Sequence, residues 1–520
     1  MMCEGFPVEF MLNNELVSLE VADIDRDTNA EPAPDTTILK MLRERGLVGT
    51  KEGCASGDCG ACTVMIGEAN PAGKIEYRSV NACISLAGSL ANKHLVTVEG
   101  LAKNPEPNQP VLHPVQSEMV ECHGSQCGFC TPGFVMSLAT LSEQTVNGDE
   151  QPEIEEARTR VLDAISGNLC RCTGYRPIIE AGINVLTNRK LESIAQNASN
   201  SFLREASGVP AGTTVKGDAG YHLPRSLTEL DDLVARFGNG VIVAGCTDFS
   251  LEITQRWQEF RTLVDITQVS ELLSLRESGD ELALGAAVTY TDIEGFFKDR
   301  SPAFVHLLHR LGSRQIRNRG TIGGNIGNAS PIADTPPVLL AWDADLVIRS
   351  CSSGAVTEES EVPIAAFYLD YRKTLLQKHQ YIAGIKISAQ AINRFHRFYK
   401  HSKRLEDDIS SVMGAFSFDG DQQQLTHARV AYGGMAAVPL RVPVVETLLL
   451  ENQLTEDLIN QACSLLIQTL TPMTDVRASA EFRAEMASEM LSRSLLEYLG
   501  KPLPRVDELE ISGNGGTENV

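Results

Sequence analysis

Residues 49–67 read GTKEGCASGDCGACTVMIG, and a fourth cysteine follows at Cys83. The spacing of the four cysteines is C-x4-C-x2-C-x20-C, which is the plant-type pattern for the ligands of a [2Fe–2S] cluster. Glycines at 53, 57 and 60 allow the loop to curl, so that its thiolates converge. The spacing therefore predicts one cluster site, with ligands Cys54, Cys59, Cys62 and Cys83. A structural zinc site is the alternative, but a zinc ribbon prefers two C-x2-C knuckles and this run has one.

A second group of cysteines lies in GSQCGFCTPG (124–133) and SGNLCRCTGYRP (166–177). Cys127 and Cys130 form C-x2-C, whereas Cys170 and Cys172 form C-x-C. Each pair follows or opens a predicted helix, and the partial positive charge of a helix N-terminus favours anionic thiolates. Zinc competes for this spacing as well, but C-x-C is unusual in a zinc knuckle. We therefore predict a second [2Fe–2S] cluster.

The chain holds 13 cysteines in 520 residues, and ten of them fall within the first 172. Cys122 lies near the second group, but the two pairs there already supply four thiolates. An odd cysteine count fits poorly with a complete disulfide framework. The cysteines without partners at ligand spacing are expected to be small buried hydrophobes: Cys3, Cys246, Cys351 and Cys463.

Length and charge narrow the class of protein. A chain of this length predicts about three or four domains. The net charge of −23 argues against nucleic acid or an anionic membrane surface as the main partner. No basic segment precedes an apolar run at the N-terminus, and no apolar run reaches about 18 residues, so we expect neither a secretory signal nor a membrane span. A cytoplasmic location is the default expectation.

The pattern of elements predicts a multidomain α+β protein. Residues 6–103 are expected to form a β-grasp ferredoxin domain, with a hairpin at 6–21, a loop at 22–35, a helix at 36–46 capped by Asp35 or Thr36, and a helix near 83–92. Residues 105–190 form a predicted four-helix domain, and 191–215 a linker. The remaining segments are an α/β domain at 216–393, an α+β domain at 394–502, and a disordered tail at 503–520.

Two glycine-rich turns are expected in the α/β domain, VIVAGCTDF (241–249) and RNRGTIGGNIGNASPIAD (317–334). Small residues expose backbone N–H groups, which can hold a pyrophosphate without side chains. Neither turn has the G-x-G-x-x-G pattern of a dinucleotide-binding Rossmann fold. From the residues alone, ordinary glycine-rich turns remain the alternative to a ligand site.

Five motifs occur together: GCASGDCGACTV, GSQCGFCTPG, GNLCRCTGYRPI, GTIGGNIGNASPIAD and DYRKTLL. With them, residues 6–500 resemble the small subunits of bacterial xanthine dehydrogenases, which belong to the molybdenum hydroxylase family. The resemblance implies a [2Fe–2S] ferredoxin domain, a helical [2Fe–2S] domain, an FAD-binding domain of the PCMH type and a C-terminal flavoprotein domain. It assigns the two cysteine sets to the two clusters.

The resemblance also implies FAD contacts at Val243, Ala244, Gly245, Cys246, Thr247, Asp248, Phe249, Thr321, Gly324, Asn325, Asn328, Asp334, Ile382 and Lys400. Tyr371 matches a position on the nicotinamide approach, and Asp407 lies in a loop that in the family affects the flavin potential and NAD access.

The partners and the reaction are likewise implied by the resemblance. A large partner subunit would bind molybdopterin, in a heterotetramer of two small and two large chains, and NAD+ would accept the electrons. The complex would oxidise xanthine to urate, and no residue that hydroxylates the substrate lies in this chain. Two alternatives remain: a hydroxylase for aldehydes, aromatic acyl-CoA or N-heterocycles, and a zinc-stabilised assembly protein without redox activity.

Overall fold

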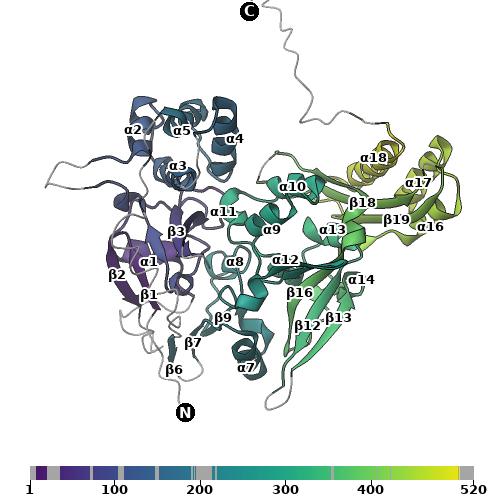
Figure 1. Cartoon of the computed structure of the whole chain (residues 1–520), viewed down its shortest axis with the longest axis horizontal. Coiled ribbons are helices and arrows are strands. Elements are labelled where there is room, and N and C mark those ends of the chain that lie inside the picture. Colours follow the sequence, from purple (N-terminus) through teal and green to yellow (C-terminus); the bar gives the residue numbers. More distant parts are fainter. Residues whose placement is uncertain are drawn as a thin grey trace, which may run out of the picture.

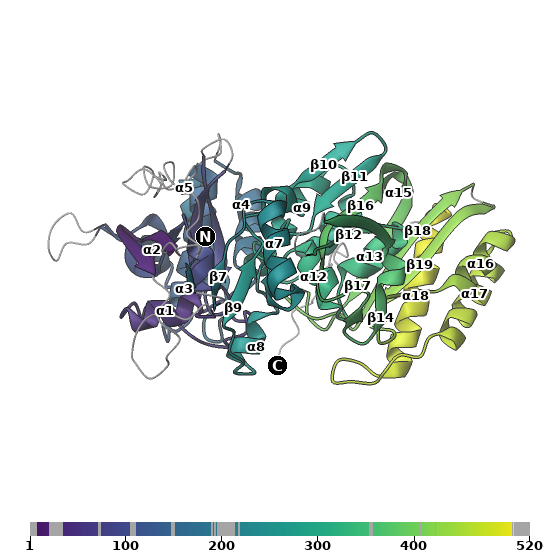
Figure 2. The same cartoon turned by 90° about the horizontal axis from the view of Figure 1, so that it is seen from below.

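The structure is a computed structural model, and it describes residues 8–19, 35–70, 74–103, 111–146, 151–188, 191, 194, 214–216, 219–352, 357–405, 407–421, 423–501 and 503. The predicted loop at 22–35, linker at 191–215 and tail at 503–520 lie almost entirely outside these residues. Along the long axis, the ribbon passes from the first sheet and its neighbouring helices, through the central sheets, to the C-terminal sheet (Figure 1). A view at right angles shows the same order (Figure 2). No helix in the described part of the chain is long and apolar enough to cross a membrane.

The N-terminal sheet has the strand order β2-β1-β5-β3-β4. Its elements are β1 Val8–Leu12, β2 Glu15–Leu19, α1 Ile38–Glu44, β3 Thr63–Ala69, β4 Ile75–Asn81 and β5 His94–Val96. The predicted hairpin is confirmed, since β1 and β2 pair antiparallel around Asn13, whose φ is 55°. Among the described strands of this sheet, β1 and β5 run parallel and the other neighbours pair antiparallel.

Two details of this unit differ from the prediction. The cap of α1 is Thr37 rather than Asp35 or Thr36, because its hydroxyl accepts a hydrogen bond from Lys40 N at 3.2 Å. The predicted helix at 83–92 is wrong, and only a 3₁₀ turn forms at Ala87–Leu90. The carbonyl groups of Ala82 and Ser85 instead accept hydrogen bonds from the start of α1, so they are not available for hydrogen bonds within a helix.

Four helices form the next unit, as predicted: α2 Pro114–Glu121, α3 Thr131–Val146, α4 Ile154–Ala164 and α5 Arg176–Asn188. The central helix is α3, in which most residues are buried. Apolar residues of α3 share one core with Met65 of β3 and Tyr77 of β4, so this unit packs directly on the first sheet.

The middle of the chain contains two further sheets. The first has the order β6-β7-β9-β8, from β6 Thr214–Lys216, β7 Ala219–His222, β8 Ile242–Val243 and β9 Thr262–Asp265. The second is antiparallel in the order β10-β11-β16-β12-β13, from β10 Leu275–Ser278, β11 Glu281–Gly285, β12 Asp345–Ser350, β13 Glu358–Pro363 and β16 Gln380–Ser388. A short ribbon pairs β14 Tyr368–Asp370 with β15 Lys373–Thr374.

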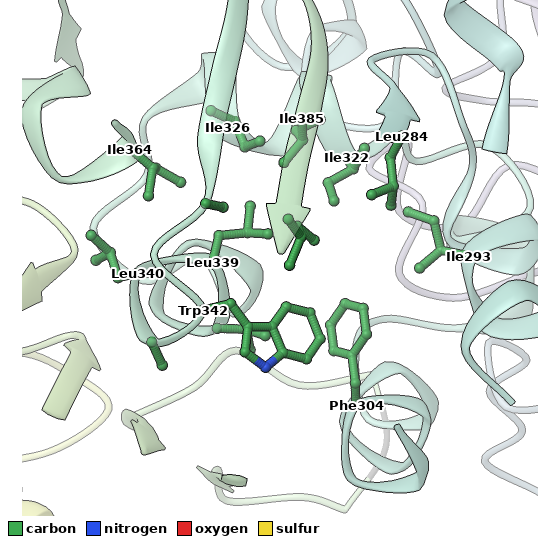
Figure 3. Close-up of a cluster of buried hydrophobic side chains, with 14 of the residues drawn as sticks. Leu284, Ile293, Phe304, Ile322, Ile326, Leu339, Leu340, Trp342, Ile364 and Ile385 are labelled. Atoms are coloured by element: carbon green, nitrogen blue, oxygen red, sulfur yellow. The ribbon is translucent and has the colours of Figure 1, made fainter. Parts of the chain in front are cut away.

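The helices of this part are α7 Leu227–Phe237, α8 Ser250–Thr254, α9 Tyr290–Phe297, α10 Pro302–His309, α11 Arg314–Arg317, α12 Ile322–Asn328, α13 Thr335–Ala341, α14 Ile364–Phe367 and α15 Ala389–Asn393. Their core surrounds Trp342, which is 1% exposed (Figure 3). Trp342 stacks on Phe297 and meets the edge of Phe304, with ring centroids 5.7 and 5.1 Å away. Such aromatic contacts stabilise a core beyond simple area burial.

The C-terminal unit is an antiparallel sheet covered by helices, as expected for an α+β domain. Its strands are β17 Phe395–His401, β18 Val412–Gly420, β19 Leu425–Gly433 and β20 Leu440–Arg441, in sequential order. Its helices are α16 Pro443–Glu451, α17 Glu456–Thr469 and α18 Ala480–Tyr498. Apolar residues of α17 and α18 share one core with β18 and β19.

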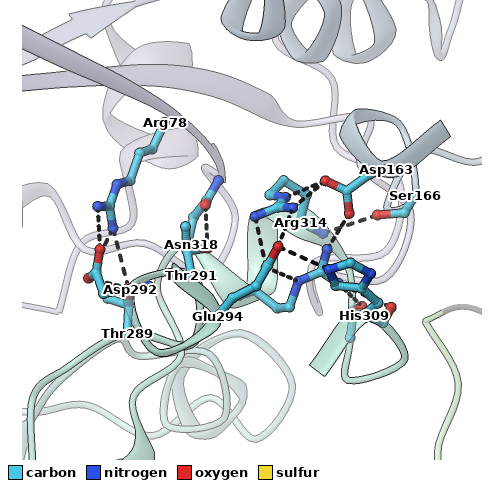
Figure 4. Close-up of polar contacts among 12 residues, drawn as sticks. Arg78, Asp163, Ser166, Thr289, Thr291, Asp292, Glu294, His309, Arg314 and Asn318 are labelled. Atoms are coloured by element: carbon cyan, nitrogen blue, oxygen red, sulfur yellow. Dashed lines mark hydrogen bonds and ion pairs between the residues drawn. The ribbon is translucent and has the colours of Figure 1, made fainter. Parts of the chain in front are cut away.

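An ion-pair network joins the four-helix unit to the middle of the chain (Figure 4). Arg314 donates from Nε to Asp163 Oδ2 at 2.7 Å, and Arg317 also pairs with Asp163. Glu294 accepts from Arg314 Nη1 at 3.2 Å and pairs with His309 at 3.0 Å. Burial opposes ionisation of Glu294, but the hydrogen bond of His309 and the charges of Arg314 and Arg317 outweigh it and lower the pKa of this carboxyl to about 2.

We expect Glu294→Gln to lower the unfolding free energy at pH 7 by roughly 1–3 kcal/mol, because the folded state favours the ionised carboxylate. The folded pKa lies below the ordinary value of 4.5, so this stability is present above pH 4.5 and is lost as the pH falls towards 2. Urea unfolding at pH 7, 4 and 3 should show that the difference in unfolding free energy between the variant and wild type becomes smaller as the pH falls. The control Glu277→Gln removes an exposed partner of Arg300 and should cost about 0.5 kcal/mol or less. A pH-independent difference would contradict the assignment.

Candidate functional site

The first cysteine set converges in the structure. The thiol of Cys54 lies within hydrogen-bonding reach of Cys59 and Cys83, and Cys62 lies within reach of Cys83. These contacts lower the pKa of Cys54 and raise that of Cys83. Cys62 and Cys83 are each 2% exposed. Gly57 and Gly60 have φ values of 86° and 65°, so the loop curls where the sequence predicted that it would.

The second set converges from two loops that lie far apart in the sequence. Cys130 directly precedes α3, and Cys170 and Cys172 lie between α4 and α5. The thiol of Cys130 meets Cys170, and that of Cys127 meets Cys172. Thr173 donates its backbone N–H to Cys170 Sγ at 3.4 Å. Cys122 bonds instead to Glu118 Oε2 at 3.8 Å and to Asn184 Nδ2 at 3.5 Å.

Both sets fit a [2Fe–2S] cluster, in which two thiolates bind each of two irons. In the second set the sulfurs form two close pairs, and in the first set every sulfur lies close to at least one other, so both sets can meet this requirement. Among the described residues, no group of three or more His, Cys, Asp or Glu side chains is placed to hold a single metal ion. The described cysteines are all free thiols.

A cavity of about 650 Å³ lies where both glycine-rich segments meet. Its size is that of cofactor pockets, which span roughly 300–1,000 Å³. Twelve of the predicted FAD residues line it: Val243, Ala244, Gly245, Cys246, Thr247, Asp248, Phe249, Thr321, Gly324, Asn325, Asn328 and Ile382. A Cβ at Gly245 would lie 1.7 Å from the carbonyl oxygen of Arg319, so only glycine fits where the two segments touch. Glycine backbone and apolar side chains both line the cavity, and this combination fits FAD.

The second glycine-rich segment is not the turn that the sequence predicted. Its central part forms α12, whose cap Thr321 accepts a hydrogen bond from Gly324 N at 3.1 Å. Glycine is a poor helix former, but a Cβ at Gly323 would lie 2.5 Å from the carbonyl oxygen of Ala286. Close packing on the sheet therefore overrides the local preference for a turn.

Asp334 and Lys400 are not among the residues that line the cavity. They form a buried ion pair, in which Lys400 Nζ lies 2.8 Å from Asp334 Oδ2 and the side chains are 2% and 8% exposed. Ser410 donates to the other carboxylate oxygen of Asp334, and Lys400 also donates to Arg310 O at 2.8 Å. The pair ties the start of α13 to β17.

We expect Lys400→Met to lower the unfolding free energy by about 3–5 kcal/mol, because it leaves the Asp334 carboxylate buried without its charge partner. Urea unfolding followed by Trp342 fluorescence, in a Trp257→Phe background, measures this change, since Trp257 is the only other tryptophan. Lys373→Met breaks an exposed pair with Asp370 and should cost no more than about 1 kcal/mol. Equal losses in the two variants would argue against the buried pair.

Several cavity residues escaped sequence analysis, among them Asn239, Tyr290, Ile316, Arg372 and Tyr381. Arg372 lies in the motif DYRKTLL, which by itself assigns no role to this residue. The others come from separate elements and carry no local motif, so spacing offered no signal for them. Tyr371 is 54% exposed beside Arg372. Burial and the charge of Asp58 raise the pKa of Asp407 to about 6, and Asp58 lies in the first cysteine loop. Burial also raises the pKa of Cys246 to about 12, and its φ is 62°.

Family models match the chain in four consecutive segments. They describe a 2Fe-2S iron-sulfur cluster binding domain at 22–88 and a [2Fe-2S] binding domain at 97–182. An FAD binding domain in molybdopterin dehydrogenase matches 215–389, and a CO dehydrogenase flavoprotein C-terminal domain matches 397–498. The fold and the two kinds of site thus define an iron–sulfur flavoprotein.

Similarity to curated proteins narrows the class of iron–sulfur flavoprotein. Xanthine dehydrogenase of Drosophila pseudoobscura pseudoobscura is 30% identical over 494 residues, which cover 84% of this chain and 36% of that protein. Xanthine dehydrogenase/oxidase of Mus musculus is 30% identical over 536 residues, covering 92% of this chain and 38% of that protein. The chain thus spans about a third of the length of these curated relatives.

Among solved structures, a chain of carbon monoxide dehydrogenase from Hydrogenophaga pseudoflava superimposes with a TM-score of 0.50 and 25% identity. The match covers 56% of this chain and all of that chain. Together, the four domains, the relatives and this structure fit an iron–sulfur/FAD subunit of the molybdenum hydroxylase family.

Proposed function

We propose that this chain is the electron-transfer subunit of a xanthine dehydrogenase. In this proposal it relays electrons from a molybdopterin-binding partner chain, through two [2Fe–2S] clusters and FAD, to NAD+. The xanthine dehydrogenase relatives and the FAD-binding family model support it. The proposed ligands are the eight cysteines of the two sets, and the proposed FAD contacts are the twelve residues around the cavity.

The observation that carries the proposal is direct contact between the three sites. Leu169, next to Cys170, donates its backbone N–H to the carbonyl oxygen of Cys59 at 3.0 Å, so the two cysteine loops are hydrogen-bonded to each other. Thr254 at the end of α8 donates to Ala55 O at 2.7 Å, and α8 follows directly from the cavity residues 243–249. The sites are thus arranged as a short series.

The two cysteine sets differ in solvent exposure, and this difference indicates the direction of electron transfer. Cys127 and Cys172 of the second set are exposed, whereas Cys62 and Cys83 of the first set are buried between the second set and the cavity side. We propose that the second set faces the electron donor. Phe129 and Leu169 beside it are 48% and 49% exposed, as expected of residues that a partner chain would cover.

When bound, the clusters supply single-electron transfer, and FAD supplies the conversion between single electrons and hydride. The protein side chains have simpler roles in the proposal. The thiolates hold the irons, and backbone N–H groups such as that of Ser56, 3.4 Å from Cys54 Sγ, offset negative charge on sulfur. Ile84, which is buried, and Ile316, which is partly buried, keep water out between the first cysteine loop and the cavity.

A second candidate is the iron–sulfur/FAD subunit of another molybdenum hydroxylase. The match with the carbon monoxide dehydrogenase structure covers the whole of that chain, and it favours this broader assignment to the family. The substrate pocket would lie on the partner, so the two candidates share every residue discussed for this chain. The substrate must therefore be tested on the assembled complex, proposed to hold two copies of each chain.

Two assays test the proposal in sequence. The full-length chain alone, mixed anaerobically with NADH, should lose the visible absorption of oxidised flavin, because hydride transfer is reversible. Unchanged flavin absorption would reject NAD+ as the acceptor. The chain co-purified with its molybdopterin partner should then reduce NAD+ in the presence of xanthine. Activity with aldehydes or N-heterocycles but not with xanthine would establish the second candidate instead.

A further inference from the structure

Helix α11 lies at the meeting point of both cysteine loops and the cavity. Ile316 lines the cavity, and a Cβ at Gly57 in the first cysteine loop would lie 3.3 Å from Ile316 Cδ1. Ser313 caps the helix, and a Cβ at Gly167 near the second loop would lie 2.5 Å from Ser313 Cβ. One turn of helix therefore contacts all three sites.

Gln315 of α11 is 1% exposed and reaches away from the cavity into the four-helix unit. Its Nε2 donates to Asn168 Oδ1 at 2.9 Å and to Ser137 Oγ at 3.0 Å. A longer contact of 3.5 Å runs to Thr63 Oγ1. The side chain thus connects the middle of the chain to the four-helix unit and to β3.

Asn168 continues this connection to the first cysteine loop. It is 2% exposed and lies two residues before Cys170. Its Nδ2 donates to the carbonyl oxygen of Gly60 at 3.0 Å and to Thr63 Oγ1 at 3.3 Å. Gly60 lies between Cys59 and Cys62, so one amide side chain joins the two cysteine loops.

The direction of every hydrogen bond in this group is fixed. Gly60 O can only accept, so Asn168 must present Nδ2 there and Oδ1 to its other neighbours. Oδ1 then accepts from Ser137 Oγ at 2.7 Å and from Gln315 Nε2. A buried network with one consistent set of donors and acceptors holds one geometry, because any shift leaves a buried polar group without its partner.

Close backbone packing also prevents the two cysteine loops and α11 from shifting against one another. A Cβ at Gly60 would lie 2.3 Å from Gly167 O and 2.6 Å from Asn168 Nδ2. A Cβ at Gly167 would lie 2.4 Å from Gln315 Oε1. The two cysteine loops and α11 therefore contact one another without space for a side chain between them.

We propose that Gln315 and Asn168 are positioning residues that set the separation of the two clusters and of the flavin site. The inference rests on the proposed function. Electrons pass singly along the chain, and two such transfers reduce one FAD, with protons taken from solvent. The rate of single-electron transfer falls as the separation of donor and acceptor grows, so a loosened junction slows transfer even when every cofactor is bound.

The test compares Gln315→Met with a matched control, Asn318→Leu, in the full-length chain. Asn318 caps α11 and also makes a buried contact between units, since its Nδ2 donates to Ser79 O at 2.9 Å. That bond ends on β4 rather than on a cysteine loop. Both variants remove a buried amide, so a general loss of stability should appear in both. Only Gln315→Met should disturb the positions of the clusters.

Two readouts separate positioning from stability. In the dithionite-reduced chain, magnetic interaction between the two cluster EPR signals depends steeply on their separation. After flash reduction by a photochemical donor, the rate of flavin reduction reports transfer along the chain. Gln315→Met should retain iron, FAD and both signals, change the magnetic splitting, and slow flavin reduction several-fold. Asn318→Leu should keep the wild-type splitting and rate.

Wild-type splitting and rate in Gln315→Met would overturn the inference. If that variant fails to accumulate folded, Ser137→Ala deletes one hydroxyl of the same group and should change the splitting in the same direction by a smaller amount; an unchanged splitting there would also overturn it. Failure of the proposed function is distinguishable, because it would appear in the wild-type chain itself, as missing cluster signals, missing flavin, or flavin that NADH does not reduce.

Discussion

Gly245→Ala is expected to abolish FAD binding by the full-length chain. The new Cβ would lie 1.7 Å from the carbonyl oxygen of Arg319 and 2.4 Å from its carbonyl carbon. Both are backbone atoms, so the contact cannot be relieved by a side-chain rotation. The two segments that line the cavity must then move apart. Because Gly320, Thr321 and Gly324 line the opposite side of the same contact, the whole cavity changes shape.

The ratio of flavin to iron in the purified protein measures this effect. We expect flavin to fall by at least about tenfold, equivalent to about 1.4 kcal/mol or more of binding free energy, while iron and both cluster EPR signals remain. The control is Gly240→Ala, five residues earlier, where a Cβ would meet no atom within 4 Å. It should keep the wild-type flavin content. Full flavin in Gly245→Ala would show that FAD does not bind in this cavity.

Cys170→Ser should remove one of two [2Fe–2S] EPR signals and leave FAD in place. The Cys170 thiol meets Cys130 across two loops, so its loss opens one of the two sulfur pairs of the second set. Iron should fall from about four to about two atoms per chain, as expected when one of two diiron clusters is lost. The first set lies in the N-terminal sheet unit and keeps all four thiols.

Cys122→Ser is the matched control for that experiment. Cys122 also lies in the four-helix unit, but its thiol bonds to Glu118 and Asn184 rather than to the second set. Both EPR signals should persist in this variant. Two intact signals in Cys170→Ser would reject the ligand assignment, and a colourless wild-type protein containing zinc would reject both clusters.

Local patterns in the sequence predicted much of the architecture. The hairpin at 6–21, the four helices of 105–190 and the helices near 455–470 and 476–499 all appear close to their predicted bounds. These elements have strong periodicity or clear turn residues. The errors fall where distant parts of the chain compete with local preference: at 83–92, which pairs with the start of α1, and at α12, where packing on Ala286 makes a helix of a glycine-rich run.

The residues of the candidate site also fall into two groups, those that local sequence identified and those whose partners only the structure shows. Cysteine spacing and glycine-rich runs are local, so they identified residues that the structure brings together around two sulfur sets and one cavity. The resemblance places Asp334 and Lys400 at the flavin, and the structure shows that they form a buried ion pair with each other. Their partnership spans 66 positions and leaves no local trace.

What spacing alone established is which residue types can bind metal and where the backbone can turn, because both depend on neighbours along the chain. It said nothing about how the three sites lie relative to one another. That arrangement depends on contacts such as Gln315 with Asn168, 147 positions apart, and Leu169 with Cys59. Buried polar groups must find partners wherever the folded chain presents them, so a relay between sites exists only in the tertiary structure.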